Sequence, residues 1–156
     1  MLFRGFLACR DPDQTTGIPA CTAMLALNEV LEKTGAKNVG FVTPYLDDVQ
    51  ARINANYERA GFRVVAEQHL GMRDNFSFST VTAEQMRAMV AEVAAARPAA
   101  IAIVCTNMRG APLADALEAA HSIPIYDTVS TTVWKSLKIA GVDTTRIKGW
   151  GTIFSI

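Results

Sequence analysis

The sequence predicts an α/β domain of three layers, α-β-α, in which helices cover both faces of a four-stranded parallel sheet. Two observations predict this class. From residue 22 onward, helix-length stretches with apolar residues three and four positions apart alternate with short runs rich in β-branched residues. The clearest of these runs, 100–104, is apolar on both faces, as a central parallel strand is.

The first half of the pattern predicts helix, strand, helix and strand. A helix over 21–34 ends before Gly35, because glycine readily takes the left-handed conformation of a helix cap. Strands are expected over 38–43 and 62–67. The helix between them is marked by an apolar stripe at helical spacing: Leu46, Val49, Ile53 and Tyr57.

The next helix starts at a capping box. Thr82 and Gln85 have the spacing at which each side chain bonds to the backbone N–H of the other residue. The helix that they begin has an apolar stripe at helical spacing: Met86, Met89, Val90 and Val93. The central strand, 100–104, follows it.

The last part of the chain predicts two helices around a fourth strand. A helix over 112–121 starts with proline, and the strand covers 123–126. The final helix carries the apolar residues Val129, Val133, Leu137 and Ala140. The tail over 149–154 has strand-like content. With these elements the domain is a Rossmann-like lobe.

Composition excludes several classes of protein. The 156 residues hold 15 Lys and Arg against 15 Asp and Glu, so the net charge gives no basis for binding nucleic acid or an anionic membrane surface. The longest apolar run is too short to span a bilayer, and we expect no signal peptide. Three cysteines without a C-x-x-C pair and two histidines argue against a disulfide framework or a zinc site. We therefore expect a cytoplasmic protein with reduced thiols.

Candidate functional residues follow the predicted strands. Ligands of open parallel sheets bind at the carboxyl ends of the strands, where loops and helix N-termini converge. No glycine-rich phosphate-binding motif follows any strand, so no nucleotide cofactor is expected. The loops instead carry hydroxyl, amide and thiol groups, and the candidates are Thr43, Tyr45, Asn75, Cys105, Thr106 and Asn107.

Cys105 carries the strongest chemistry. It ends the central strand and precedes the turn toward a helix, where backbone N–H groups and the helix dipole favour a thiolate. A thiolate there would act as a nucleophile or as an acid and base. The alternative is a buried cysteine that only packs at the strand end.

The neighbouring candidates offer hydrogen-bond donors. Thr106 and Asn107 would bind a carboxylate or enediolate oxygen, or else cap a helix. Tyr45 follows a proline and either points its phenol over the sheet edge or packs beside the next helix. Asn75 binds a carboxylate or serves as a turn residue. The other thiols and imidazoles are expected to be structural, incidental or at the surface: Cys9, Cys21, His69 and His121.

Five short segments occur in order over nearly the whole chain: Thr16-Gly17-Ile18-Pro19, Val42-Thr43-Pro44-Tyr45, Asp74-Asn75-Phe76, Cys105-Thr106-Asn107 and Gly149-Trp150-Gly151. Together they resemble the aspartate/glutamate racemase superfamily, and within it the branch of maleate cis-trans isomerase and arylmalonate decarboxylase. The resemblance implies two similar α/β lobes with the active site between them and no metal or organic cofactor.

The resemblance also implies roles for the candidates. Cys105 corresponds to the second-lobe cysteine, Tyr45 to a tyrosine that binds the substrate carboxylate, and Asn75 to the asparagine of the isomerases. Further oxygens would be bound by Thr43, Thr106 and Asn107. In isomerase-like chemistry a first-lobe thiolate adds to the double bond of maleate, the resulting single bond rotates, and elimination gives fumarate. Cys105 would give and take a proton.

The sequence departs from the family in its first lobe. The opening strands of that lobe and its Cys-Thr-Ser-like or Gly-Thr-Ser-like loop do not occur here, and neither Cys9 nor Cys21 matches the first-lobe position. We therefore expect 1–20 to be a remnant of the first lobe or a linker, 21–141 to be the α/β lobe, and 142–156 to be a tail strand that returns toward the mostly missing first lobe.

The resemblance implies a cofactor-independent, cysteine-dependent isomerase or racemase that acts on a small dicarboxylate or 2-substituted carboxylate, most like maleate cis-trans isomerase. Cys105-Thr106-Asn107 favours this reaction, because glycines tend to follow this cysteine in the decarboxylases. The alternatives are an arylmalonate decarboxylase-like or aspartate/glutamate racemase-like enzyme. An alternative of another class is a catalytically silent binding lobe, and a homodimer is an open possibility.

Overall fold

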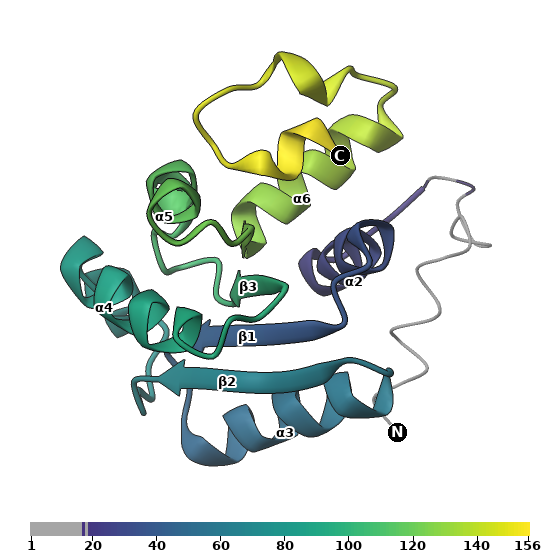
Figure 1. Cartoon of the computed structure of the whole chain (residues 1–156). Coiled ribbons are helices and arrows are strands. Elements are labelled where there is room, and N and C mark those ends of the chain that lie inside the picture. The colour runs from purple at the N-terminus through teal and green to yellow at the C-terminus, as the bar shows by residue number, and fades with distance from the viewer. Residues whose placement is uncertain (1–16, 18) are drawn as a thin grey trace.

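A computed structural model of the chain describes residues 17 and 19–156 (Figure 1). The expectation for Cys9, residues 16 and 18 of the first family segment, and most of the proposed first-lobe remnant 1–20 lie outside these residues. No helix in the described part of the chain is long and apolar enough to cross a membrane.

The centre of the fold is the predicted parallel sheet. Its strands are β1 (Asn38–Thr43), β2 (Arg63–His69), β3 (Ala100–Ile103) and β4 (Ile125–Asp127), in the order β2-β1-β3-β4. All three pairings are parallel. The sheet therefore confirms the fold class, although β2 runs to His69 and β4 begins two residues later than expected.

Helices cover both faces of the sheet, as Figure 1 shows. On one face, α2 (Ala23–Thr34), α3 (Asp47–Arg59) and α6 (Thr128–Ile139) enclose a core that includes Phe41, Tyr57 and Trp134. On the other face, α4 (Ala83–Ala94) and α5 (Ala114–His121) enclose a second core that includes Met86 and Ile103. Short 3₁₀ turns, η1 (Ser77–Thr80) and η2 (Ala111–Leu113), precede α4 and α5.

Local signals at the helix ends are confirmed. The Thr82 side chain accepts from the Gln85 N–H, and the Gln85 side chain accepts from the Thr82 N–H, which completes the capping box. Gly35 ends α2 with a φ of 68°, in the left-handed region. These signals involve residues three positions apart or less, so they do not depend on the rest of the fold.

Two apolar stripes lie differently from what the spacing predicts. On α6, Val129 and Val133 are 38% and 41% exposed, whereas Trp134 is fully buried. On α3, Val49 is exposed and Gln50 is buried. The side chains that these helices bury are instead the Trp134 indole on α6 and the hydrogen-bonded Gln50 amide on α3.

The predicted tail strand is wrong. The tail forms two 3₁₀ turns, η3 (Thr144–Arg146) and η4 (Thr152–Ser155). Gly149 and Gly151 have φ angles of 80° and 89°, which interrupt extended backbone. The tail, yellow in Figure 1, packs beside α6 and buries Ile153 in the core.

The Glu118 carboxylate of α5 holds the tail in place. It accepts from the Thr152 N–H at 2.7 Å and from the Thr152 hydroxyl at 3.0 Å, and also from the Ile125 N–H at 2.9 Å. One side chain thus joins α5, β4 and η4, so this tail is packed against the lobe that carries Cys105.

Candidate functional site

The carboxyl ends of the strands bring the predicted residues together. Parallel strands end at one edge, so the loops after β1, β2 and β3 meet there. Tyr45 contacts Cys105 across this edge, and Asn107 contacts Asn75. Four of the six candidates therefore form two pairs between different loops.

Cys105 lies two residues beyond β3. Its side chain is 5% exposed, is not part of a disulfide, and packs on the core that contains Ile101 and Ile103. The Cys105 carbonyl accepts from the Met108 N–H at 3.2 Å, which closes a turn. The 3₁₀ turn η2 begins only at Ala111, so the helix terminus expected directly after Cys105 is displaced along the chain by this turn.

Tyr45 is half-buried beside the thiol. Its ring packs edge-on against Phe78, with centroids 5.6 Å apart, and its hydroxyl lies close enough to Cys105 for the two groups to influence each other's ionisation. Burial, followed by the charge and the hydrogen bond of Cys105, raises the pKa of Tyr45 to about 12. The phenol therefore keeps its proton at neutral pH and is a donor, either to the Cys105 sulfur or to a substrate oxygen.

A second contact joins the loops after β2 and β3. The Asn107 amide Nδ2 donates to the Asn75 carbonyl at 2.9 Å, while Thr106 remains exposed. The Asp74 carboxylate accepts from the backbone N–H and the hydroxyl of Ser77, and these bonds lower the pKa of Asp74. Asn75 thus sits in a well-defined turn, with its backbone used for loop packing and its side chain at the surface.

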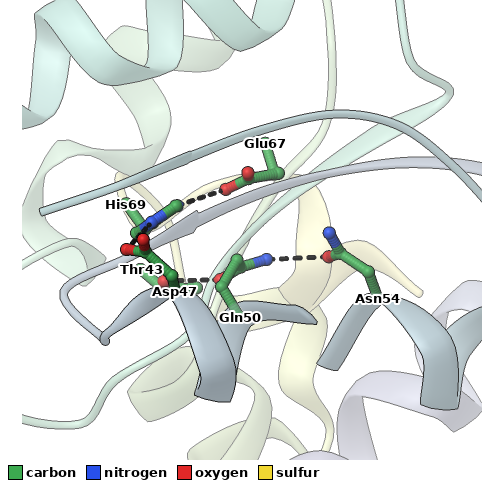
Figure 2. Close-up of polar contacts among 6 residues, drawn as sticks. All are labelled: Thr43, Asp47, Gln50, Asn54, Glu67 and His69. Carbon is green, nitrogen blue, oxygen red and sulfur yellow. Dashed lines mark hydrogen bonds and ion pairs between the residues drawn. The ribbon is translucent and has the colours of Figure 1, made fainter. Parts of the chain in front are cut away.

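Thr43 has a contact inside the fold. Its buried hydroxyl donates to Gln50 Oε1 at 2.7 Å, and Gln50 Nε2 donates to Asn54 Oδ1 at 2.8 Å, as Figure 2 shows. The hydroxyl proton is therefore used to join the end of β1 to α3. Binding of substrate by Thr43 stays a prediction.

Asp127, at the end of β4, is not among the six functional residues predicted from the sequence. Oδ1 accepts from the N–H groups of Val129 and Ser130, which caps α6, whereas Oδ2 is buried with no partner among the described residues. Burial raises the pKa of Asp127 to about 7. A Cβ at Gly110 would lie 2.6 Å from Oδ2, so the carboxyl lies directly against the loop that follows Cys105. The position of an aspartate between a strand and a helix was the available signal.

Both ring nitrogens of His69 have polar partners within the fold, as expected for a structural histidine. Both ring nitrogens lie within hydrogen-bond distance of a carboxylate, one of Glu67 and one of Asp47 (Figure 2). Within residues 17 and 19–156, no group of three or more His, Cys, Asp or Glu side chains is placed to hold a metal ion.

Comparison with known proteins identifies the family. The family model described as arylmalonate decarboxylase matches residues 8–154. The chain belongs to the arylmalonate decarboxylase family. This membership confirms the branch of the superfamily that the sequence segments resemble.

Isomerases are among the relatives of this chain. A curated maleate isomerase of Nocardia farcinica is 26% identical over 114 residues, which are 72% of this chain and 45% of that protein. The chain therefore spans about half the length of this relative.

Two solved structures share the fold. Maleate isomerase Iso of Pseudomonas putida S16 superposes with a TM-score of 0.84 at 24% identity, over 92% of this chain and 58% of that one. A Cys-to-Ser variant of the Nocardia farcinica maleate cis-trans isomerase holds a covalently bound succinylcysteine intermediate. It superposes with a TM-score of 0.80 at 22% identity, over 85% of this chain and 54% of that one.

Proposed function

We propose that this chain forms the Cys105-bearing lobe of a cofactor-independent isomerase or racemase that acts at a carbon next to a carboxylate, most like maleate cis-trans isomerase. The observation that carries the proposal is the placement of the buried Cys105 thiol next to the Tyr45 hydroxyl at the carboxyl edge of the sheet. A thiol, a phenol donor and two amide-bearing loops at one edge form a site for a small carboxylate.

The proposed chemistry at Cys105 is proton transfer. As a thiol it donates its proton to a substrate carbon and becomes a thiolate; in the reverse step the thiolate removes a proton from that carbon. Tyr45 keeps its own proton, because its pKa lies near 12, and binds either the thiolate or a carboxylate oxygen. Thr106 and Asn107 supply further donors for the substrate oxygens.

The proposed substrate is a small dicarboxylate. Support comes from the Nocardia farcinica structure, in which the cysteine adduct is a succinyl group, the product of adding a thiol to a four-carbon unsaturated dicarboxylate. By analogy, a second thiolate from the opposite side of the substrate would add to the double bond, allow rotation, and leave. In this proposal residues outside 21–141 supply that group.

Decarboxylation is the second candidate reaction. It is supported by the family model, which is the arylmalonate decarboxylase family and covers residues 8–154. Both reactions would use the same thiol as a proton donor to carbon, so Cys105 itself does not separate them. The substrate decides between them.

The compartment and the assembly also belong to the proposal. We place the protein in the cytoplasm, with reduced thiols, because its three cysteines have no spacing typical of a disulfide framework. A homodimer is supported by apolar surface on α6, where Val129 and Val133 are exposed. Light scattering of the purified protein measures this assembly directly.

The test is a panel of three reactions with the natural polypeptide, whose mass is first established by intact mass spectrometry. Proton NMR follows maleate conversion to fumarate, chiral chromatography follows aspartate racemisation, and released carbon dioxide reports decarboxylation of an arylmalonate. Maleate conversion is the expected result. Turnover of arylmalonate alone would transfer the assignment to the decarboxylases, and turnover of none of the three would favour a silent binding lobe.

A further inference from the structure

The turn that carries Tyr45 is tied to its surroundings along its whole length. Residues 44–46 connect β1 to α3, and the preceding Thr43 is bound to Gln50. The backbone N–H groups of the segment 70–72 donate to the carbonyls of residues 43–45, at 2.8 to 3.3 Å. The conformation of this turn therefore depends on how the end of β2 is held against the start of α3.

His69 joins these two elements. It is the last residue of β2 and pairs in register with Thr43 of β1. Its Nδ1 lies 2.8 Å from Glu67 Oε2, and its Nε2 lies 3.0 Å from Asp47 Oδ1 (Figure 2). Asp47 is the first residue of α3 and comes two positions after Tyr45.

The two contacts favour the charged form of the ring. A carboxylate oxygen accepts hydrogen bonds only, and a neutral imidazole carries one N–H. Both nitrogens of His69 donate only when the ring is an imidazolium. The bridge from Glu67 through His69 to Asp47 is therefore a charged link, with one cation between two anions.

We propose that His69, as an imidazolium bridging Glu67 and Asp47, is a positioning residue that holds the Tyr45 turn so that the Tyr45 hydroxyl stays on Cys105. The proposal rests on the proposed function for the roles of Tyr45 and Cys105. It assigns His69 no contact with the substrate: the imidazolium acts through the turn and through Tyr45.

A dependence on pH follows. Hydrogen bonds to Glu67 on β2 and then to Asp47 on α3, together with the charges of these two groups, raise the pKa of His69. A group whose pKa is raised in the folded state stabilises that state fully below its ordinary pKa. This stabilisation is lost as the pH rises through the pKa of the group in the folded protein. The bridge is thus complete in mildly acid solution and lost in alkaline solution.

The test measures the alkylation of Cys105 by iodoacetamide, resolved from the other thiols by peptide mass spectrometry. Because Tyr45 donates to the thiolate, loosening the turn slows this reaction. We expect His69→Gln and Asp47→Asn to slow it by about two- to five-fold at pH 6.5, the size of coupling within one hydrogen-bond network. Matched controls are His121→Gln, on the opposite edge of the sheet, and Asp48→Asn, whose partner is Arg52.

Two further measurements distinguish positioning from a general structural effect. In a Tyr45→Phe background, His69→Gln should have no additional effect, because the group through which it acts is gone. The ratio of wild-type to His69→Gln rates should also fall toward one as the pH is raised, because the imidazolium loses its proton. An equal effect in both backgrounds, no effect at pH 6.5, or an effect that does not decrease with rising pH overturns the proposal.

The readout keeps this inference separate from the proposed function. Alkylation needs no substrate and no turnover. If the coupling of His69 to Cys105 is present while maleate, aspartate and arylmalonate are all inert, the positioning role holds and the proposed reaction fails. If turnover is present without the coupling, the positioning role fails alone.

Discussion

The Tyr45 hydroxyl lies next to the Cys105 thiol, although the two residues belong to loops that follow different strands, β1 and β3. The contact exists because β1 and β3 are neighbours in the order β2-β1-β3-β4, so their carboxyl ends lie side by side. Cys105 and Tyr45 thereby form one chemical unit, a thiol beside a phenol that keeps its proton at neutral pH.

Replacing Tyr45 by Phe tests this unit. The substitution keeps the ring against Phe78 and removes the hydroxyl that lies next to the Cys105 thiol. We expect kcat for maleate to fall by about ten- to hundred-fold, the usual cost of a hydrogen bond to a charged group. Initial rates measured by proton NMR check it, and an unchanged kcat would remove Tyr45 from the site.

Tyr57 provides a matched control. It is buried beside Phe41, and its hydroxyl has no hydrogen-bond partner among the described residues. Burial raises its pKa, so the phenol is neutral. Tyr57→Phe should stabilise the fold by about 1 kcal/mol, because it removes an unsatisfied polar atom, and should leave turnover unchanged. Urea unfolding measures the first effect; a destabilised variant would show that the hydroxyl has a partner in solution.

Asp127 predicts a pH dependence of stability. Burial raises its pKa to about 7, so the stability that the neutral carboxyl contributes is complete at acid pH and is lost as the pH rises toward 7. Above that pH the wild-type protein holds a buried charge. Asp127→Asn keeps an acceptor for the α6 cap and removes the charge. The free energy of unfolding of the variant relative to wild type should therefore rise between pH 5 and pH 8, by about 2–4 kcal/mol.

The measurement for Asp127 is urea unfolding of both proteins at the two pH values. Val129 and Ser130 still receive a capping oxygen in the variant, so a loss of the helix cap does not complicate the comparison. Parallel stability profiles for wild type and variant would mean that the Asp127 carboxyl does not titrate in this range.

Gly40 tests the packing of α4 on the sheet. A Cβ at this position would lie 2.3 Å from Val93 Cγ1 on α4, and the pairing of β1 with β2 shifts register beside it. Gly40→Ala should destabilise the protein by about 1–3 kcal/mol, through overpacking. Adding Val93→Ala should recover part of this loss, whereas additive losses in the double variant would contradict the contact.

The sequence predicted what depends on short spacing. The Thr82–Gln85 capping box, the Gly35 cap and the run 100–104 involve neighbours along the chain, so local physics decides them. The tail was mistaken for a strand because apolar content suits both a strand and a buried 3₁₀ turn. What decides between them is the positive φ of the glycines and the Glu118 carboxylate, which is far away in sequence.

The site was predictable as a set of loops, but not as a set of contacts. The position of Cys105 and Tyr45 after strands follows from the alternation of elements. The approach of Tyr45 to Cys105 depends on strand order and register, as do the bond from the Thr43 hydroxyl to Gln50 and the two carboxylates on His69. Asp127 shows the same limit, because its burial against Gly110 depends on the pairing of β3 with β4.

The most direct test of the central claim compares Cys105→Ser with Cys21→Ser in the maleate assay on the natural polypeptide. Both substitutions exchange a cysteine for its closest oxygen analogue, but of these two residues Cys105 is the one that lies beside Tyr45 at the sheet edge. The account predicts that Cys105→Ser lowers turnover by about a thousand-fold or more, while Cys21→Ser matches wild type. A Cys105→Ser protein that turns over maleate at the wild-type rate would contradict the account.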